Sequence, residues 1–282
     1  MKNNLIASKE IGDYRIEVYT DPCPECPTSW DLTGIFLWNY SDADSLSRNC
    51  SWKEAFGKNA SLGDCSINYA LRCLILENVD CKKIIKALKD KDGEGFFGMK
   101  LAYCSNTHCW ELFENATKPN VQHHVLGEFE PEELKDGYMF EQLTKLLEKD
   151  ELVQVVEKYV EDIALIEWSS TGYSQGDYVE GIAYCDKERF GKMGFEPNED
   201  WKEKAKSVML GESKDIGNWM WGNVYWYDLD KKVEFTKHYK DGRPDEDCFE
   251  WEEVDSCSGY YCDSPYDLIE EVAKDYKLTE EA

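Results

Sequence analysis

Apolar and polar residues alternate in several short stretches of the chain, a period typical of β-strands. Residues 14–20 ("YRIEVYT") alternate in this way, and residues 33–40 ("TGIFLWNY") form a more continuously apolar stretch. The Pro-rich residues between them predict a corner. Similar patterns predict strands near residues 98–104, 163–168, 177–185 and 248–261.

Residues 219–239 combine many aromatic residues with the same alternation. The pattern predicts a hairpin that turns around Asp230 and Lys231. If the first part is a strand, Trp219, Trp221, Tyr225 and Tyr227 share one side, and Met220, Val224 and Trp226 share the other. We expect one side to belong to the core. A second aromatic side would be a candidate protein-contact surface.

Apolar residues spaced three and four positions apart predict helices elsewhere. Residues 66–93 predict two short helices that end at Gly93, and residues 200–212 predict another. The chain closes with a predicted helix over residues 264–276, with Ser264 as N-cap and Pro265 at the first helical position. One or two further helices are predicted within residues 131–162 by the apolar positions Leu143, Leu146, Leu147, Leu152, Val155, Val156, Tyr159 and Val160.

The mixture of these elements predicts an α+β fold with a largely antiparallel sheet and helices packed on one side. No unit of 20 to 50 residues repeats, and no linker is evident. We expect an N-terminal α+β part over residues 1–130 and a helix plus strand-rich part over residues 131–282. One continuous domain is the alternative.

The chain carries 58 Asp and Glu against 32 Lys and Arg, a net charge of −26. Such a protein should be repelled by nucleic acid and anionic membranes and attracted to basic surfaces. The N-terminal residues lack the apolar core of a secretory signal, and no apolar run reaches membrane-spanning length. We therefore expect a cytosolic protein whose twelve cysteines stay thiols.

The chain offers only irregular signals for metal binding or catalysis. Cys23 and Cys26 have C-x-x-C spacing, but the second pair needed for zinc, Cys104 and Cys109 with His108, is too widely spaced for one tight turn. None of the four histidines lies in a catalytic motif, and no glycine loop has the spacing that cradles phosphate. We predict no catalytic residue, no metal site and no cofactor.

Carboxylates cluster between residues 241 and 255, where eight acidic residues accompany one basic residue, Arg243. A strand there would place Glu250 and Glu252 on one face, and Trp251 and Glu253 on the other. Like charges so close repel one another unless a cationic partner neutralises them. Two interpretations stay open: a binding surface, and a solvated acidic edge that resists aggregation. A second acidic face is expected on the long helix predicted in this region: Glu128, Glu130, Glu132, Glu133, Asp136, Glu141, Glu148, Asp150, Glu151, Glu157, Glu161 and Asp162.

The acidic cluster and the aromatic strand together give the candidate partner-binding residues. These are Asp245, Glu246, Asp247, Glu250, Glu252, Glu253, Asp255, Trp219, Trp221 and Trp226.

Several segments, in order and nearly end to end, make the chain resemble a loosely defined family of acidic proteins encoded by bacteriophages and mobile elements, most of them uncharacterised. The family pattern has Ser where this chain has Cys26, which implies that the corner needs no thiolate and that the C-x-x-C pair is not a metal half-site. The matching positions are Asp21, Glu25, Pro27, Trp30, Asp31, Tyr173, Ser174, Gln175, Gly176, Asp177, Gly222, Val254, Asp255, Ser256, Cys257 and Gly259.

Phage origin, which the resemblance implies, and the negative charge together suggest an anti-defence inhibitor in the host cytoplasm. Its expected partner is a bacterial defence protein complex, a nuclease with a basic DNA channel that carboxylates can occupy in place of phosphates. We expect no direct contact with nucleic acid, no membrane contact, and a homo-oligomer. The alternatives are a metal-dependent hydrolase or nucleotide-degrading enzyme that uses clustered carboxylates, and a phage structural component.

Overall fold

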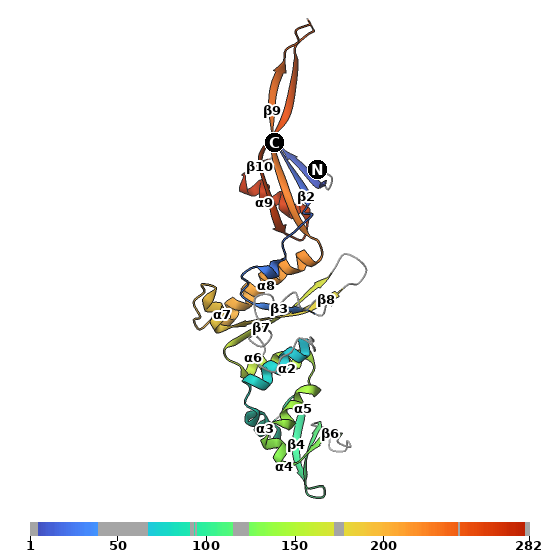
Figure 1. Cartoon of the computed structure of the whole chain (residues 1–282), viewed down its shortest axis with the longest axis vertical. Helices are drawn as coiled ribbons and strands as arrows, with labels where there is room; N and C mark the ends of the chain where they lie inside the picture. The colour runs from blue at the N-terminus through green and yellow to red at the C-terminus, as the bar shows by residue number, and fades with distance from the viewer. Residues whose placement is uncertain are drawn as a thin grey trace. The chain divides into compact units, whose positions relative to one another are not determined.

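The chain divides into two compact units, each assembled from segments distant in the sequence. Unit 1 comprises residues 1–32, 169–178 and 210–282, and unit 2 comprises residues 33–168 and 179–209. Both contain helices and antiparallel strands (Figure 1), which confirms the predicted α+β class. The structure, a computed structural model, describes residues 5–38, 67–90, 93, 95–114, 124–171, 178–241 and 243–279.

Unit 1 is built on a four-stranded antiparallel sheet with the strand order β1–β2–β9–β10. One face of this sheet is covered by α9 (Pro265–Asp275), which packs against β1 and β2. Ile16, Val18, Leu229 and Leu268 are completely buried between sheet and helix. The strands are β1 (Leu5–Ile11), β2 (Tyr14–Thr20), β9 (Val224–Lys237) and β10 (Glu246–Tyr261).

Helix α9 begins as its sequence predicts. The Ser264 hydroxyl accepts a hydrogen bond from the backbone N–H of Tyr266, and Pro265 occupies the first helical position. The first N–H groups of a helix have no carbonyl partner within the helix, and proline lacks an N–H. Its fixed φ is also close to the helical value.

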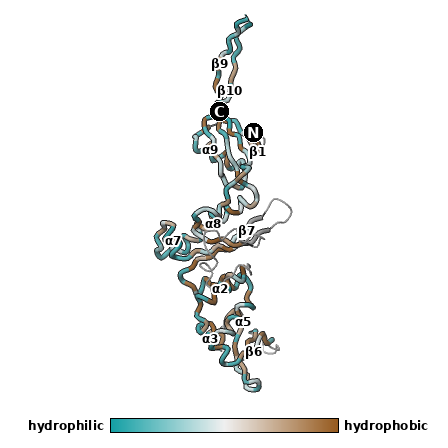
Figure 2. Tube along the Cα trace, viewed as in Figure 1, coloured by the Kyte–Doolittle hydropathy of each residue, from teal (hydrophilic) through white to brown (hydrophobic). Residues whose placement is uncertain are grey.

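Unit 2 contains most of a three-stranded sheet with the order β3–β8–β7, and all of a second one with the order β4–β5–β6. Figure 2 shows the hydrophobic run of β7, where Ile163 to Ile166 are all buried. A strand without a polar alternation is expected where both faces of a sheet are covered. The strands are β3 (Ile35–Trp38), β7 (Ile163–Thr171), β8 (Tyr178–Asp186), β4 (Met99–Cys104), β5 (Cys109–Glu114) and β6 (Val125–Phe129).

The helices of unit 2 supply most of its core, with α2 packed against α5 and α6. Helix α8 (Trp201–Met220) begins in unit 2 and ends in unit 1. Within the described part of the chain, no helix combines the length and apolar character needed to cross a membrane. The other helices of unit 2 are α2 (Ile67–Asn78), α3 (Cys81–Lys89), α4 (Pro131–Lys135), α5 (Tyr138–Leu146), α6 (Lys149–Tyr159) and α7 (Lys187–Lys192).

The region predicted as one or two helices over residues 131–162 contains three: α4, α5 and α6. Gly137 has a left-handed backbone (φ +80°) that separates α4 from α5, and Glu148 is the N-cap of α6. A continuous acidic face on one long helix was therefore a wrong prediction. Glu148 and Glu151 form a capping box, as do Glu130 and Glu133 at α4, so these carboxylates satisfy helix N–H groups.

The predicted strand at Trp219–Trp221 is also wrong, because α8 continues to Met220. Gly222, with φ +74°, ends the helix: its N–H donates to the carbonyl of Trp219, and the N–H of Asn223 donates to that of Asn218. This is the Schellman arrangement, which favours glycine at the left-handed position. Strand β9 begins only at Val224.

No hairpin turn occurs at Asp230 and Lys231. β9 runs through both residues without a break, and residues 238–245 connect it to β10. Asp230 is buried and accepts a hydrogen bond from Arg15 of β2, so this position is held inside the sheet. Residues 173–177, which carry part of the family resemblance, lie outside the described residues.

Candidate partner-binding site

The hairpin of β9 and β10 extends beyond the rest of the sheet in unit 1 (Figure 1). β2 pairs with β9 only as far as Tyr14 opposite Lys231, whereas β9 and β10 stay paired to Lys237 opposite Glu246. We call residues 233–250 the arm. Five residue pairs at about 3.4 Å per residue give it a reach of about 17 Å before its loop.

Strand register assigns the arm two faces. Val233, Phe235 and Glu250 lie on the first face, which continues the sheet face covered by α9. Glu234 and Phe249 lie on the second. The same register puts Glu252 on the first face and Trp251 and Glu253 on the second, which confirms the predicted alternation.

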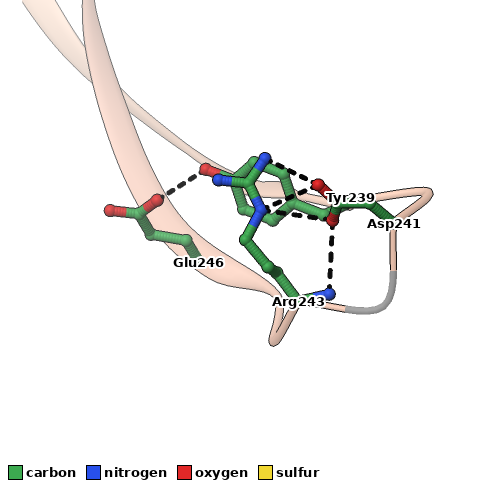
Figure 3. Close-up of polar contacts among 4 residues, drawn as sticks. All are labelled: Tyr239, Asp241, Arg243 and Glu246. Atoms are coloured by element: carbon green, nitrogen blue, oxygen red, sulfur yellow. Dashed lines mark hydrogen bonds and ion pairs between the residues drawn. The ribbon is translucent and has the colours of Figure 1, made fainter.

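The loop of the arm is ordered by polar contacts among four residues (Figure 3). The Arg243 guanidinium donates to the Asp241 carboxylate at 2.9 and 3.2 Å, lowers the pKa of that carboxyl group, and lies 4.3 Å from the Tyr239 ring centre. The Tyr239 hydroxyl donates to Glu246 at 2.7 Å, which raises the pKa of the phenol. Asp241 and Glu246 therefore hold the loop together.

Several other carboxylates of the predicted cluster also have partners inside the protein. Asp247 accepts a hydrogen bond from Thr236 at 3.0 Å, and Asp245 lies 2.8 Å from Nδ1 of His238. Glu253 accepts one from Ser256 at 3.2 Å. Glu250 and Glu252 are exposed and make no hydrogen bond or ion pair with any described residue. These two are the carboxylates that an external cation can reach without displacing an internal contact.

β9 supplies cations that lie opposite carboxylates of the cluster. Lys237 lies opposite Glu246, and Lys231 opposite Glu252. These lysines are visible in the sequence, but with the turn placed at Asp230 and Lys231 they could not be assigned to the strand facing the carboxylates. The arm therefore carries mixed charge, six acidic residues against three Lys and Arg.

A partly buried ion pair lies at the base of the arm: Asp230 is buried, and the Arg15 side chain is 23% exposed. The Arg15 guanidinium donates to Asp230 at 2.5 Å and lies 4.7 Å from the ring centre of Trp251. It also lies 3.6 Å from Glu17. β2, β9 and β10 are thereby joined where the four-stranded sheet becomes the two-stranded arm. Sequence patterns missed this pair, because its members are 215 residues apart.

The three candidate tryptophans lie outside the arm. Trp219 lies in the last turn of α8, Trp221 lies in the turn that follows the helix, and both are half-buried. Trp226 lies on β9, where its ring stacks on Tyr19 at 4.2 Å between ring centres. Tyr225 and Tyr227 are buried on the α9 side, so one face of the aromatic strand belongs to the core as expected.

Asp255 connects β10 to the end of α9. Its carboxylate accepts hydrogen bonds from the hydroxyl groups of Tyr276 and Tyr227, the latter at 2.7 Å. These bonds lower the pKa of Asp255. Burial, with the bond to Asp255, raises the pKa of Tyr227. Asp255 was a candidate contact residue, and the structure gives it an internal role.

Replacing Asp255 with Asn should destabilise unit 1 at pH 7 and have less effect in acid. The folded-state pKa is lowered, so the stabilisation is present above the unfolded value of about 3.9 and is lost as the pH falls through the folded value. Urea unfolding of both proteins at neutral pH and below pH 3.9 measures the difference. Tyr276→Phe is the matched variant and should show the same trend. A loss that is equal at both pH values would contradict this role.

The thiols do not assemble a metal site in the described part of the chain. The ten cysteines described there are free, and no group of three or more His, Cys, Asp or Glu is placed to hold a metal ion. Cys23 and Cys26 belong to unit 1, and Cys104 and Cys109 to unit 2. Cys104 and Cys109 face each other across the β4–β5 hairpin.

Three of the segments that carry the family resemblance meet in unit 1. The backbone N–H of Asp21 donates to the carbonyl of Val224 at 2.8 Å, and the Tyr261 hydroxyl donates to the carbonyl of Glu25 at 2.5 Å. The ring of Trp30 packs edge-on against Tyr261 at 5.1 Å between centres. The Pro-rich corner, the start of β9 and the end of β10 thus form one structural cluster.

Negative charge is concentrated in unit 1. That unit holds 27 Asp and Glu against 11 Lys and Arg, a net charge of −16 over 115 residues, whereas unit 2 has −10 over 167. Comparison with known proteins finds no family model, no curated protein and no solved structure that matches this chain. The resemblance to the phage-encoded family stays a prediction.

Proposed function

We propose that the protein is a non-enzymatic, phage-encoded inhibitor that acts in the host cytoplasm on a bacterial defence complex. Its partner is a nuclease with a basic DNA channel, and the acidic surface of unit 1 blocks access of DNA to that channel. The observation that carries this proposal is the projecting arm with Glu250 on it and Glu252 at its base, both exposed and without an internal partner among the described residues.

The arm suits this role for physical reasons. Carboxylates can neutralise the lysines and arginines that otherwise hold phosphates, and they attract such a surface over about a Debye length. A two-stranded arm enters a channel more readily than the broad face of a sheet. Phe235, which is 42% exposed, lies on the same face as Glu250 and would add apolar contact area.

Challenge of bacteria that carry single defence systems, with and without this protein, identifies the target. Binding of that nuclease to labelled DNA is then measured with wild type and with Glu250→Gln/Glu252→Gln. We expect the double variant to inhibit at least about tenfold less well, because two charge contacts are lost while side-chain shape is kept. Wild-type inhibition should weaken as salt is added.

The matched control is Glu270→Gln/Glu271→Gln, which removes two exposed charges from α9 in the same unit. It should inhibit like wild type. Equal losses for both double variants would assign the effect to total charge and not to the arm. Absence of a complex with every defence nuclease tested, together with unchanged DNA binding, would refute the proposed function.

A further inference from the structure

Unit 2 contains a lysine-rich groove in this strongly acidic protein. The groove lies between α3, α4 and β5 and has a volume of about 1130 Å³. Lys82, Lys83, Lys86, Lys89 and Lys135 line it, and Asp90 is the acidic residue among its described lining. The groove is open to solvent, and its volume lies just above the upper end of the roughly 300–1,000 Å³ typical of small-molecule pockets, so an extended segment can lie in it.

The lysines of the groove are poorly compensated. Lys82, Lys83, Lys86 and Lys135 make no ion pair with any residue in the described ranges. Lys89 lies over the ring of Trp110 at 3.9 Å from its centre. Other lysines of unit 2 do have acidic partners, as Lys206 has in Glu157 at 2.5 Å. Unneutralised cations gathered in a chain of net charge −26 point to an anionic occupant.

The floor of the groove is apolar. Ile85 and Trp110 are half-buried, and Leu134 is buried beneath the lysines. An occupant that fits must therefore present an apolar side chain surrounded by carboxylates. A phosphate group alone would satisfy the lysines but would leave the apolar floor uncovered.

The second face of the arm presents an exposed aromatic side chain with carboxylates beside it. Phe249 is 55% exposed, Glu234 lies directly opposite it, and Asp247 is two residues away on the same face. Lys232 shares this face, 3.2 Å from Glu234 and 5.0 Å from the centre of the Phe249 ring, and Thr236 donates to Asp247, so docking must exchange these exposed contacts for contacts to the groove lysines. Glu234 and Asp247 are diagonal neighbours across the strand pair, which places them about 7–8 Å apart. Lys82, Lys86 and Lys89 repeat at helical spacing on α3, about 5–6 Å apart per turn. The carboxylates and the lysines thus have comparable spacing.

We propose that the lysine groove of one protomer binds the Phe249 face of the arm of a second copy of this chain. Phe249 covers the apolar floor, and Glu234 and Asp247 pair with Lys82 and Lys86. Because arm and groove are different surfaces, the contact is head-to-tail and produces a ring or an open chain. It leaves Glu250 and Glu252 on the opposite face, free for the partner of the proposed function.

Light scattering after size exclusion tests this contact with the full chain, whose protomer mass is 32.7 kDa. We expect wild type to self-associate at physiological ionic strength and to dissociate in high salt. Lys82→Glu/Lys86→Glu and Glu234→Lys/Asp247→Lys should each weaken association at least about tenfold. Mixing the two variants should restore a complex, because one carries an intact arm and the other an intact groove.

Lys204→Glu/Lys274→Glu is the matched control, with the same change in charge at exposed positions outside the groove. It should associate like wild type, and circular dichroism verifies that all variants are folded. A wild type that stays monomeric at high concentration overturns the inference. So does an oligomer that neither double variant weakens. Lys82→Glu/Lys86→Glu keeps Glu250 and Glu252, so its inhibition of the nuclease reports on the proposed function separately.

Discussion

Replacing Arg15 with alanine will lower the stability of the β2–β9–β10 region by about 1–3 kcal/mol. Asp230 is 5% exposed, and its carboxylate lies 2.5 Å from the Arg15 guanidinium. Without Arg15, Asp230 is a buried charge with its ion-pair partner gone, and Trp251 loses the cation that lies against its ring. Hydrogen exchange of the β9 and β10 amide groups measures the change in that region of the chain.

Two further variants separate charge from packing. Arg15→Lys keeps the positive charge but loses the planar fork of donors, so we expect a smaller loss than for alanine. Arg15→Met/Asp230→Leu removes both charges and should recover most of the stability, because a buried ion pair is often replaceable by apolar residues of similar volume. If the double variant is as unstable as Arg15→Ala, the unpaired charge of Asp230 does not cause the loss of stability in Arg15→Ala.

Local signals predict the elements whose stabilising contacts are close in sequence. Strand β2 alternates over residues 14–20, and α9 begins at Ser264 and Pro265, as the sequence indicates. The end of α8 is also locally encoded, because Gly222 is the residue that its closing turn requires. The aromatic residues around Trp219 favour a strand by intrinsic preference, and helix packing overrides that preference.

The arm depends on contacts that no local pattern reveals. Asp230 and Lys231 resemble turn residues in the sequence, yet pairing with β2 and the ion pair to Arg15 keep them inside a 14-residue strand. The acidic cluster of β10 is visible in the sequence. The sequence does not show which of these carboxylates are free. The hydrogen bonds from Thr236, Tyr239 and Tyr276 to three of them form only once the strands are in register.

Replacing Gly181 with alanine will destabilise unit 2 by at least about 1–3 kcal/mol. Gly181 lies on β8, and the indole of Trp168 on β7 packs over it. An added Cβ would lie 2.1 Å from Cε2 of Trp168, a distance that no real contact allows. Trp168 is 7% exposed and has little room to move, so the two strands must shift. Urea unfolding followed by hydrogen exchange in β7 and β8 measures the loss.

The close approach of Gly181 and Trp168 also predicts how the two positions interact. Trp168→Leu alone should be destabilising because it leaves a cavity, but it removes the ring atoms that meet the new Cβ. Gly181→Ala/Trp168→Leu should therefore lose less stability than the two single variants summed. Gly191→Ala is the matched control: a Cβ there meets no atom within 4 Å, and alanine favours helix α7 by about 0.5–1 kcal/mol. If the double variant loses as much stability as the two single variants summed, the new methyl group at position 181 clashes with the backbone and not with the indole of Trp168.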